Sequence, residues 1–215
     1  MMPMDFERKE AIEIVNWLIE KGLSTAMKET RNFHPETWAY HDVGLEGARF
    51  DVYAGATKGV IVPLDSDFVI KFDYVPQPYC AREYANYKAA VEAGLEQYFP
   101  YTDLLCVAED IEFYIQERAE TGAGCTVGNH AIDTLRQRYA DSGEVYSDWQ
   151  LWDELDELNA DETVELIFED PDLCDFIVQH HINDLHMGNF GEIYGRGVII
   201  DFSGFGSQIF MGKPE

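Results

Sequence analysis

Positive charge is scarce in this sequence. Its 215 residues include 15 Lys and Arg against 41 Asp and Glu, which gives a formal net charge of −26 at pH 7. Such a chain repels the phosphate backbone of nucleic acids and anionic lipid surfaces. We therefore expect no direct binding to nucleic acid and none to a membrane surface, whereas a basic protein partner is compatible with this charge.

Cysteine is also rare, and long apolar runs are missing. The four Cys residues are widely spaced and form no Cys-x-x-Cys pair, a pattern that favours free thiols in a reducing compartment over a disulfide framework. No apolar run approaches membrane-spanning length, and the first residues lack the basic start and apolar core of a secretion signal. The expected location is the cytoplasm.

Internal repeats and low-complexity tracts are absent as well. With 46% apolar and 26% charged residues, the composition is that of a globular chain. The length allows one ordinary domain or two small lobes with a sizeable core. A disordered chain and a large multidomain assembly are therefore excluded.

Apolar periodicity predicts a mixture of helices and strands in the first half of the chain. The expected elements, in chain order, are helices at 5–21 and 24–31, strands at 50–53, 59–62 and 67–72, a helix at 79–93, and strands at 103–108 and 111–116. Glycines and a Pro-Leu-Asp-Ser-Asp turn separate the first three strands, so we expect them to pair antiparallel.

The second half reads as mostly helical. We place a boundary at the glycine-rich break 121–124, which leaves a helical extension at 1–49, a sheet lobe at 50–120 and a helical lobe at 121–215. The expected elements of this last part are helices at 129–139, 148–158 and 161–180, the third interrupted by Pro171, and a hairpin of 190–194 and 198–201 around a turn at 195–197.

Acidic residues are concentrated in this second half. Between Arg138 and Arg196 there is no Lys or Arg, while sixteen Asp and Glu fall in the same stretch. A charge run of this kind is usually a solvated face. The functional alternative is an acidic docking surface for a basic partner.

The most specific pattern is Ile-Asn-Asp-Leu-His-Met-Gly-Asn-Phe-Gly at 182–191, followed by Val-Ile-Ile-Asp-Phe-Ser-Gly at 198–204. Asp184 precedes Asn189 by five residues, and Asn189 precedes Asp201 by twelve. This spacing resembles the catalytic loop and metal-binding motif of the protein-kinase-like superfamily, which includes protein kinases and aminoglycoside phosphotransferases. The resemblance implies an α+β, bilobal protein-kinase-like fold with a small antiparallel sheet lobe and a reduced, mostly helical lobe.

The resemblance also implies roles for these residues. Asp184 would be the catalytic base at the attacking hydroxyl, and His186 would contact the transferring phosphate. Asn189 and Asp201 would supply oxygen ligands to Mg²⁺, which bridges the phosphates of ATP. Taken alone, Asp184 and Asn189 are each more typical of residues that cap turns.

The first half offers the phosphate-binding parts in the family's order. Lys71 ends the third strand, where the resemblance implies a phosphate-positioning lysine, and a buried lysine needs a carboxylate partner. Glu83 on the following helix is the expected partner, with Glu92 as the alternative. A lysine whose aliphatic stem lies along the sheet with its charge in water is the ordinary reading of Lys71.

Two further segments are expected to contact the nucleotide. The run from Gly55 to Gly59 lies between the first two strands, where a loop would cover the phosphates with backbone N–H groups, although a hairpin turn also uses glycine. The strand that ends at Gln116 leads into a hinge, and the backbone from Gln116 to Arg118 would hydrogen-bond adenine.

The sequence departs from the family at two points. Ile182 stands where the family usually has His, with His181 beside it, and only eleven residues follow Gly204. The substrate-binding elements that usually follow the metal-binding Asp are therefore not expected, and the helix at 5–21 or the acidic segment at 139–175 would replace them. A kinase fold of this size resembles the minimal kinase effectors of bacterial pathogens and small phage or bacterial kinases, and an effector would act in the host cytosol.

The leading hypothesis is an ATP- and Mg²⁺-dependent phosphotransferase that phosphorylates a protein hydroxyl, with AMP transfer as a variant of the same chemistry. One alternative is a catalytically inactive kinase-like scaffold that binds a basic partner through its acidic face. A second is an acidic nucleic-acid mimic that occupies a DNA-binding protein. A third is a metal site, with the candidate ligands Cys174, His180, His181 and His186.

Overall fold

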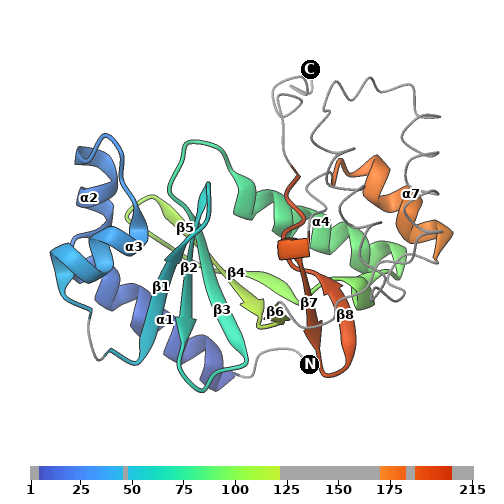
Figure 1. Ribbon diagram of the computed structural model, residues 1–215, viewed down its shortest axis with the longest axis horizontal. Helices are drawn as coiled ribbons and strands as arrows, with labels where there is room; N and C mark the ends of the chain where they lie inside the picture. The colour runs from blue at the N-terminus through green and yellow to red at the C-terminus, as the bar shows by residue number, and fades with distance from the viewer. Residues whose placement is uncertain (1–4, 46–47, 122–169, 183–186, 205–215) are drawn as a thin grey trace. The chain divides into compact units, whose positions relative to one another are not determined.

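The computed structural model describes residues 5–45, 48–121, 170–182 and 187–204 (Figure 1). The chain divides into two compact units. Unit 1 comprises Met1–Lys88 and Pro100–Arg118, and unit 2 comprises Ala89–Phe99 and Ala119–Glu215. The helices expected at 129–139 and 148–158 lie outside the described residues, as does most of the acidic stretch.

Unit 1 contains a five-stranded antiparallel sheet in the order β1-β2-β3-β5-β4. The strands are β1 (Phe50–Ala54), β2 (Lys58–Pro63), β3 (Phe68–Asp73), β4 (Thr102–Ala108) and β5 (Ile111–Glu117). All five expected strands are present, each within two residues of its expected ends. The mixed helix and antiparallel-sheet class expected from the sequence is confirmed, because the same unit also carries helices.

Those helices include two that the sequence predicts at its start and one between β3 and β4. They are α1 (Asp5–Glu20), α2 (Leu23–Glu29) and α4 (Tyr79–Ala93), together with the short α3 (Pro35–Thr37) and the π-helix η1 (Trp38–Val43). The sequence did not predict α3 and η1. Gly22 has a φ of 92°, which ends α1 and turns the chain into α2.

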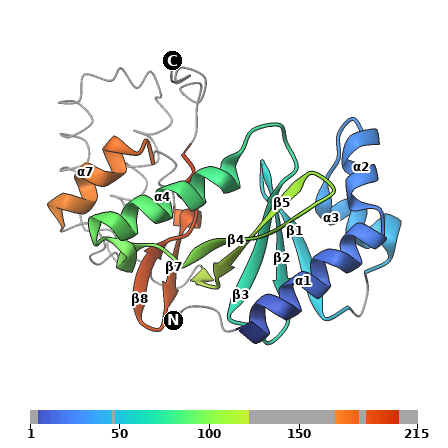
Figure 2. The same cartoon turned by 180° about the vertical axis from the view of Figure 1, so that it is seen from behind.

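One face of the sheet is apolar and forms the core of unit 1. Strand alternation places every second side chain on this face, so that Ile70 and Phe72 of β3 lie beside Phe113 and Ile115 of β5. These four side chains are at most 1% exposed. Helix α1 lies across this face near β4 and β5 (Figure 2) and adds Val15 and other apolar side chains to the same cluster.

The other face of the sheet is polar. Lys58 is opposite Asp73 in the β2–β3 register, and Lys71 is opposite Tyr114 in the β3–β5 register, so all four share this face. The first part of α4 packs against it, with the rings of Tyr84 and Tyr114 5.8 Å apart. The polar face of this sheet therefore places charged side chains between its strands and α4.

Unit 2 contains a three-stranded antiparallel sheet in the order β6-β7-β8. Its described elements are the end of α4, the 3-10 helices η2 (Glu96–Tyr98) and η3 (Met187–Asn189), helix α7 (Pro171–Gln179), and strands β6 (Glu120–Thr121), β7 (Phe190–Ile193) and β8 (Arg196–Ile199). Phe99 lies at the centre of the core, with its ring 5.7 Å from Phe176 and 5.0 Å from Phe202.

Two details of unit 2 correct the sequence analysis. Pro171 begins α7 instead of interrupting a helix, because Asp170 caps it by accepting the N–H of Asp172 at 2.9 Å. The hairpin turn is Tyr194 and Gly195, with φ of 51° and 79°, and Arg196 already belongs to β8. Residues 161–169 of the expected helix lie outside the described residues.

The expectations of free thiols and of no membrane-spanning segment can be compared with the structure of the described residues. Cys80, Cys106 and Cys174 are free thiols, as expected, and Cys125 is outside the described part. Within the residues that the structure describes, no helix has the length and apolar character needed to cross a membrane.

Candidate functional site

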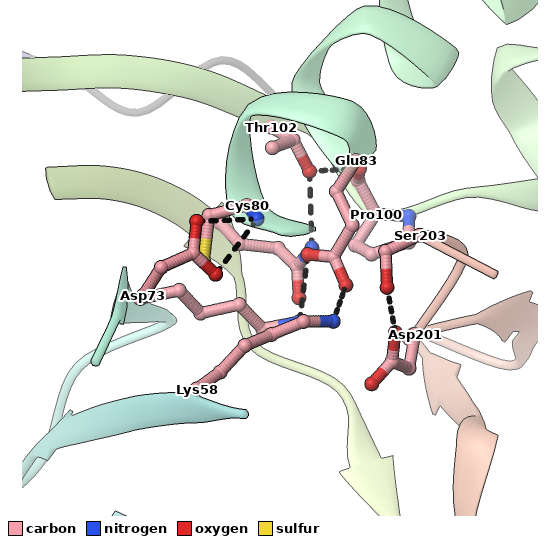
Figure 3. A network of polar contacts seen from close by, with 10 residues as sticks. Lys58, Asp73, Cys80, Glu83, Pro100, Thr102, Asp201 and Ser203 are labelled. Atoms are coloured by element: carbon pink, nitrogen blue, oxygen red, sulfur yellow. Dashed lines mark hydrogen bonds and ion pairs between the residues drawn. The ribbon is translucent and has the colours of Figure 1, made fainter. Parts of the chain in front are cut away.

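A buried cluster of two lysines and one glutamate lies between the polar face of the sheet and α4. The Nζ of Lys58 is 2.5 Å from Oε1 of Glu83 (Figure 3), and the Nζ of Lys71 is 3.1 Å from Oε2 of the same carboxylate. The structure thus brings Lys71 and Glu83 together as the sequence analysis expected. It adds Lys58, which the sequence analysis did not single out.

All three side chains are shielded from solvent. Their exposed fractions are 5% for Lys58, 9% for Lys71 and 1% for Glu83. Moving an ion out of water costs several kcal/mol, and the ion pair offsets this cost only when its geometry is good. A chain seldom keeps three such charges together without a use for them, and clustered buried charges are typical of functional sites.

Asp73 fixes the start of the helix that carries Glu83. Its two carboxylate oxygens lie 3.1 and 3.0 Å from the backbone N of Cys80, which donates to them in the first turn of α4 (Figure 3). Burial raises the pKa of Asp73 to about 6, although the Cys80 N–H and the nearby Lys58 act in the opposite direction. Asp73 therefore anchors α4 directly to the end of β3, two residues after Lys71.

Further polar side chains extend the cluster along the sheet. The amide of Gln116 donates to Oγ1 of Thr102 at 3.1 Å, and that hydroxyl donates to the carbonyl of Pro100 at 3.1 Å. Tyr114 donates its hydroxyl to Glu112, and its pKa is raised, first by burial and then by this bond. The side chain of Gln116 on β5 thus forms a hydrogen bond to the neighbouring strand β4.

In the expected hinge, two backbone N–H groups already have hydrogen-bond acceptors within the protein. The backbone N–H of Glu117 donates to Tyr101 at 2.8 Å, and the N–H of Arg118 donates to Asp67 at 2.8 Å. The Arg118 guanidinium is 3.5 Å from the carbonyl of Pro63 at the end of β2 and 3.5 Å from that of Ser66 in the β2–β3 turn. The N–H groups of residues 117 and 118 therefore already have acceptors within unit 1, and adenine binding by the backbone from Gln116 to Arg118 stays a prediction.

The connection between β1 and β2 is shorter than expected. It consists of Gly55, Ala56 and Thr57, closed by the Gly55 N–H, which donates to the carbonyl of Lys58 at 2.9 Å. Gly59 lies within β2, where a Cβ would be 2.3 Å from the ring of Phe72. Gly59 is therefore needed for close packing in the sheet.

Unit 2 holds the pair expected to bind Mg²⁺. Asn189 immediately precedes β7 and Asp201 follows β8, and the carbonyl of Asn189 accepts the N–H of Ile200 at 2.8 Å. The two residues thus lie at the same end of the β7–β8 hairpin. Asp201 accepts a hydrogen bond from the Ser203 hydroxyl at 3.0 Å (Figure 3), which fixes one carboxylate oxygen.

The other two expected catalytic residues, Asp184 and His186, lie outside the described residues. In the part of the chain that is described, no group of three or more His, Cys, Asp or Glu side chains could hold a metal ion. The described members of the alternative metal site, Cys174, His180 and His181, therefore do not form such a group. His180 instead stacks on Phe176, with ring centroids 4.1 Å apart.

Glu83 is the partner of Lys71, and the alternative Glu92 is exposed. Lys58 could have been recognised from strand alternation: if β2 begins at residue 58, Lys58 lies on the same face as Val60, whose register partner is Lys71.

No family model and no curated protein matches the chain. The residues of this chain are therefore the basis for a proposal about its function.

Proposed function

We propose that this protein is an ATP- and Mg²⁺-dependent phosphotransferase with a two-lobed, kinase-like fold, acting on a protein hydroxyl. The observation that carries the proposal is the buried ion pair between Lys71 of β3 and Glu83 of α4. In protein kinases a lysine on the third strand pairs with a glutamate on the following helix, and the pair positions the phosphates of ATP.

The surroundings of the pair support this assignment. The lysine lies on the third strand of a five-stranded antiparallel sheet, and the glutamate lies on the helix between the third and fourth strands. A lysine ammonium in a buried, low-dielectric site is a strong partner for a phosphate oxygen. Fixing Lys71 through Glu83 removes the side-chain freedom that binding would otherwise have to restrict.

Unit 2 supplies the donor types that magnesium needs. Asn189 and Asp201 offer an amide oxygen and a carboxylate from one end of a hairpin, and Mg²⁺ prefers oxygen ligands. When bound, magnesium would offset the charge of the phosphates. In this proposal Asp184 takes the proton of the acceptor hydroxyl and His186 contacts the transferring phosphate, as the resemblance implies.

Calorimetric titration with ATP, in the presence and absence of Mg²⁺, tests the proposal. We expect saturable, magnesium-dependent binding by the wild type. Lys71→Met should weaken it, because a cation that contacts phosphate is lost, and Asp201→Asn should remove its magnesium dependence. Lys28→Met and Glu192→Gln are matched controls, because Lys28 and Glu192 are exposed side chains in units 1 and 2, respectively.

Two results would count against the proposal. Absence of ATP binding at any magnesium concentration would leave the kinase-like scaffold as the better hypothesis. If the Lys28 and Lys71 variants weaken ATP binding equally, the loss reflects the overall charge of the protein and not a binding site at Lys71.

A further inference from the structure

The cluster contains one more lysine than the proposed function requires. Lys58 of β2 and Lys71 of β3 each contact a different oxygen of the Glu83 carboxylate, at 2.5 and 3.1 Å. One carboxylate therefore holds two ammonium groups side by side. Since the side chain of Glu83 is only 1% exposed, its carboxylate holds both ammonium groups in fixed positions.

The strand register explains why the two lysines meet. Lys58 lies on the same face of the sheet as Val60, and Val60 is directly opposite Lys71 in the β2–β3 ladder. The two lysines are thus diagonal neighbours on adjacent strands, a separation that long side chains can bridge. Helix α4 lies over this face and brings Glu83 to the point where both side chains end.

Lys58 also has a distinctive position in the chain. It is the first residue of β2, directly after the three-residue connection Gly55–Thr57, and its carbonyl closes that connection by accepting the Gly55 N–H. The same residue thus links the tight β1–β2 turn to the lysine pair. A phosphate chain that contacts the Lys71 ammonium therefore has the Lys58 ammonium close by, because both groups contact the same carboxylate.

We propose that Lys58 is a second phosphate-binding lysine, and that the Lys58–Glu83–Lys71 cluster selects ligands with two or more linked phosphates. This inference rests on the proposed nucleotide site and defines its ligand class. Two fixed ammonium groups attract the larger negative charge of two linked phosphate groups more strongly than the charge of a single phosphate group. Charge-assisted hydrogen bonds of this kind are about twice as strong as neutral ones.

The test is a ligand series measured by calorimetry with ATP, ADP, AMP and inorganic pyrophosphate. We expect the wild type to prefer ATP and ADP strongly over AMP. Lys58→Met should weaken ATP binding by roughly tenfold to a hundredfold, the usual effect of losing one charged hydrogen bond, and should reduce the preference over AMP. Lys58→Arg should retain part of the affinity, and Lys28→Met should retain all of it.

A labelling experiment on the wild-type protein avoids any folding defect of the variants. In an acyl phosphate of ATP, a lysine amine attacks the acyl carbon, forms an amide and releases ATP. Peptide mass spectrometry should find both Lys58 and Lys71 acylated, and excess ATP should protect both.

The outcomes separate this inference from the proposed function. Labelling and affinity that depend on Lys71 and not on Lys58 would overturn the second lysine and leave the nucleotide site intact. Absence of ATP binding by the wild type would overturn both.

Discussion

The three-charge cluster predicts an unequal response to removing its members. Glu83→Gln leaves two buried ammonium groups that both contacted the lost carboxylate. Breaking a buried ion pair in this way typically costs about 3–5 kcal/mol, and mutual repulsion of the two lysines adds to the cost. Lys71→Met is milder, because Glu83 keeps Lys58 as its partner. We expect a loss of roughly 1–2 kcal/mol, close to one charged hydrogen bond less the gain from burying an apolar side chain.

Urea denaturation followed by tryptophan fluorescence measures these differences. Lys58→Met should resemble Lys71→Met, and the double variant Lys58→Met/Lys71→Met should cost more than the sum of the two, because it leaves the Glu83 carboxylate without either lysine. Adding Glu83→Leu to the double variant should restore most of the loss, since apolar residues often replace a buried ion cluster without penalty. The reasoning is refuted if Glu83→Gln is no more destabilising than either single lysine variant.

Two further predictions concern packing and pH. Gly59→Ala should destabilise the protein by roughly 1–3 kcal/mol, because its Cβ would overlap the buried Phe72 ring, whereas Gly55→Ala, with its nearest contact at 3.7 Å, should be nearly neutral in thermal denaturation. Equal effects of the two would contradict this. The folded-state pKa of Asp73 is raised from 3.8 to about 6, so the folded state binds more protons between these values and this group makes the protein less stable as the pH rises from about 4 to 6. Asp73→Asn, whose amide oxygen can still accept the Cys80 N–H, should remove this pH dependence in urea denaturation; an unchanged pH profile would show that Asp73 does not titrate there.

Much of unit 1 could be predicted because its sequence pattern is local. Strand alternation and helical spacing set the elements from β1 to β5, and glycines end the helices. The Lys71–Glu83 pair was predicted because the resemblance to the protein-kinase-like superfamily implies a strand lysine and a glutamate on the following helix, and the chain has both in that order. Lys58 was missed because its side of the sheet depends on where β2 begins, and the sequence placed that start one residue later.

Other features depend on tertiary context that no local pattern carries. The π-helix η1 lacks the 3.6-residue period by which helices are recognised. The hairpin turn begins one residue earlier than predicted, because Tyr194 adopts a positive φ, which a side chain of this size seldom does. The N–H groups of Glu117 and Arg118 are used by carbonyls from distant segments, Tyr101 and Asp67. Such bonds appear only once the chain has folded.

The central proposal is that the Lys71–Glu83 pair binds the phosphates of a nucleotide and that the Asn189–Asp201 pair binds its metal. Chemical-shift mapping of the isotope-labelled protein with a non-hydrolysable ATP analogue tests it most directly. With Mg²⁺ we predict shifted signals at Lys58, Lys71 and Glu83, and with Mn²⁺ we predict the strongest broadening at Asn189 and Asp201. Unchanged signals at all of these residues, or shifts and broadening confined to other residues, would contradict the account.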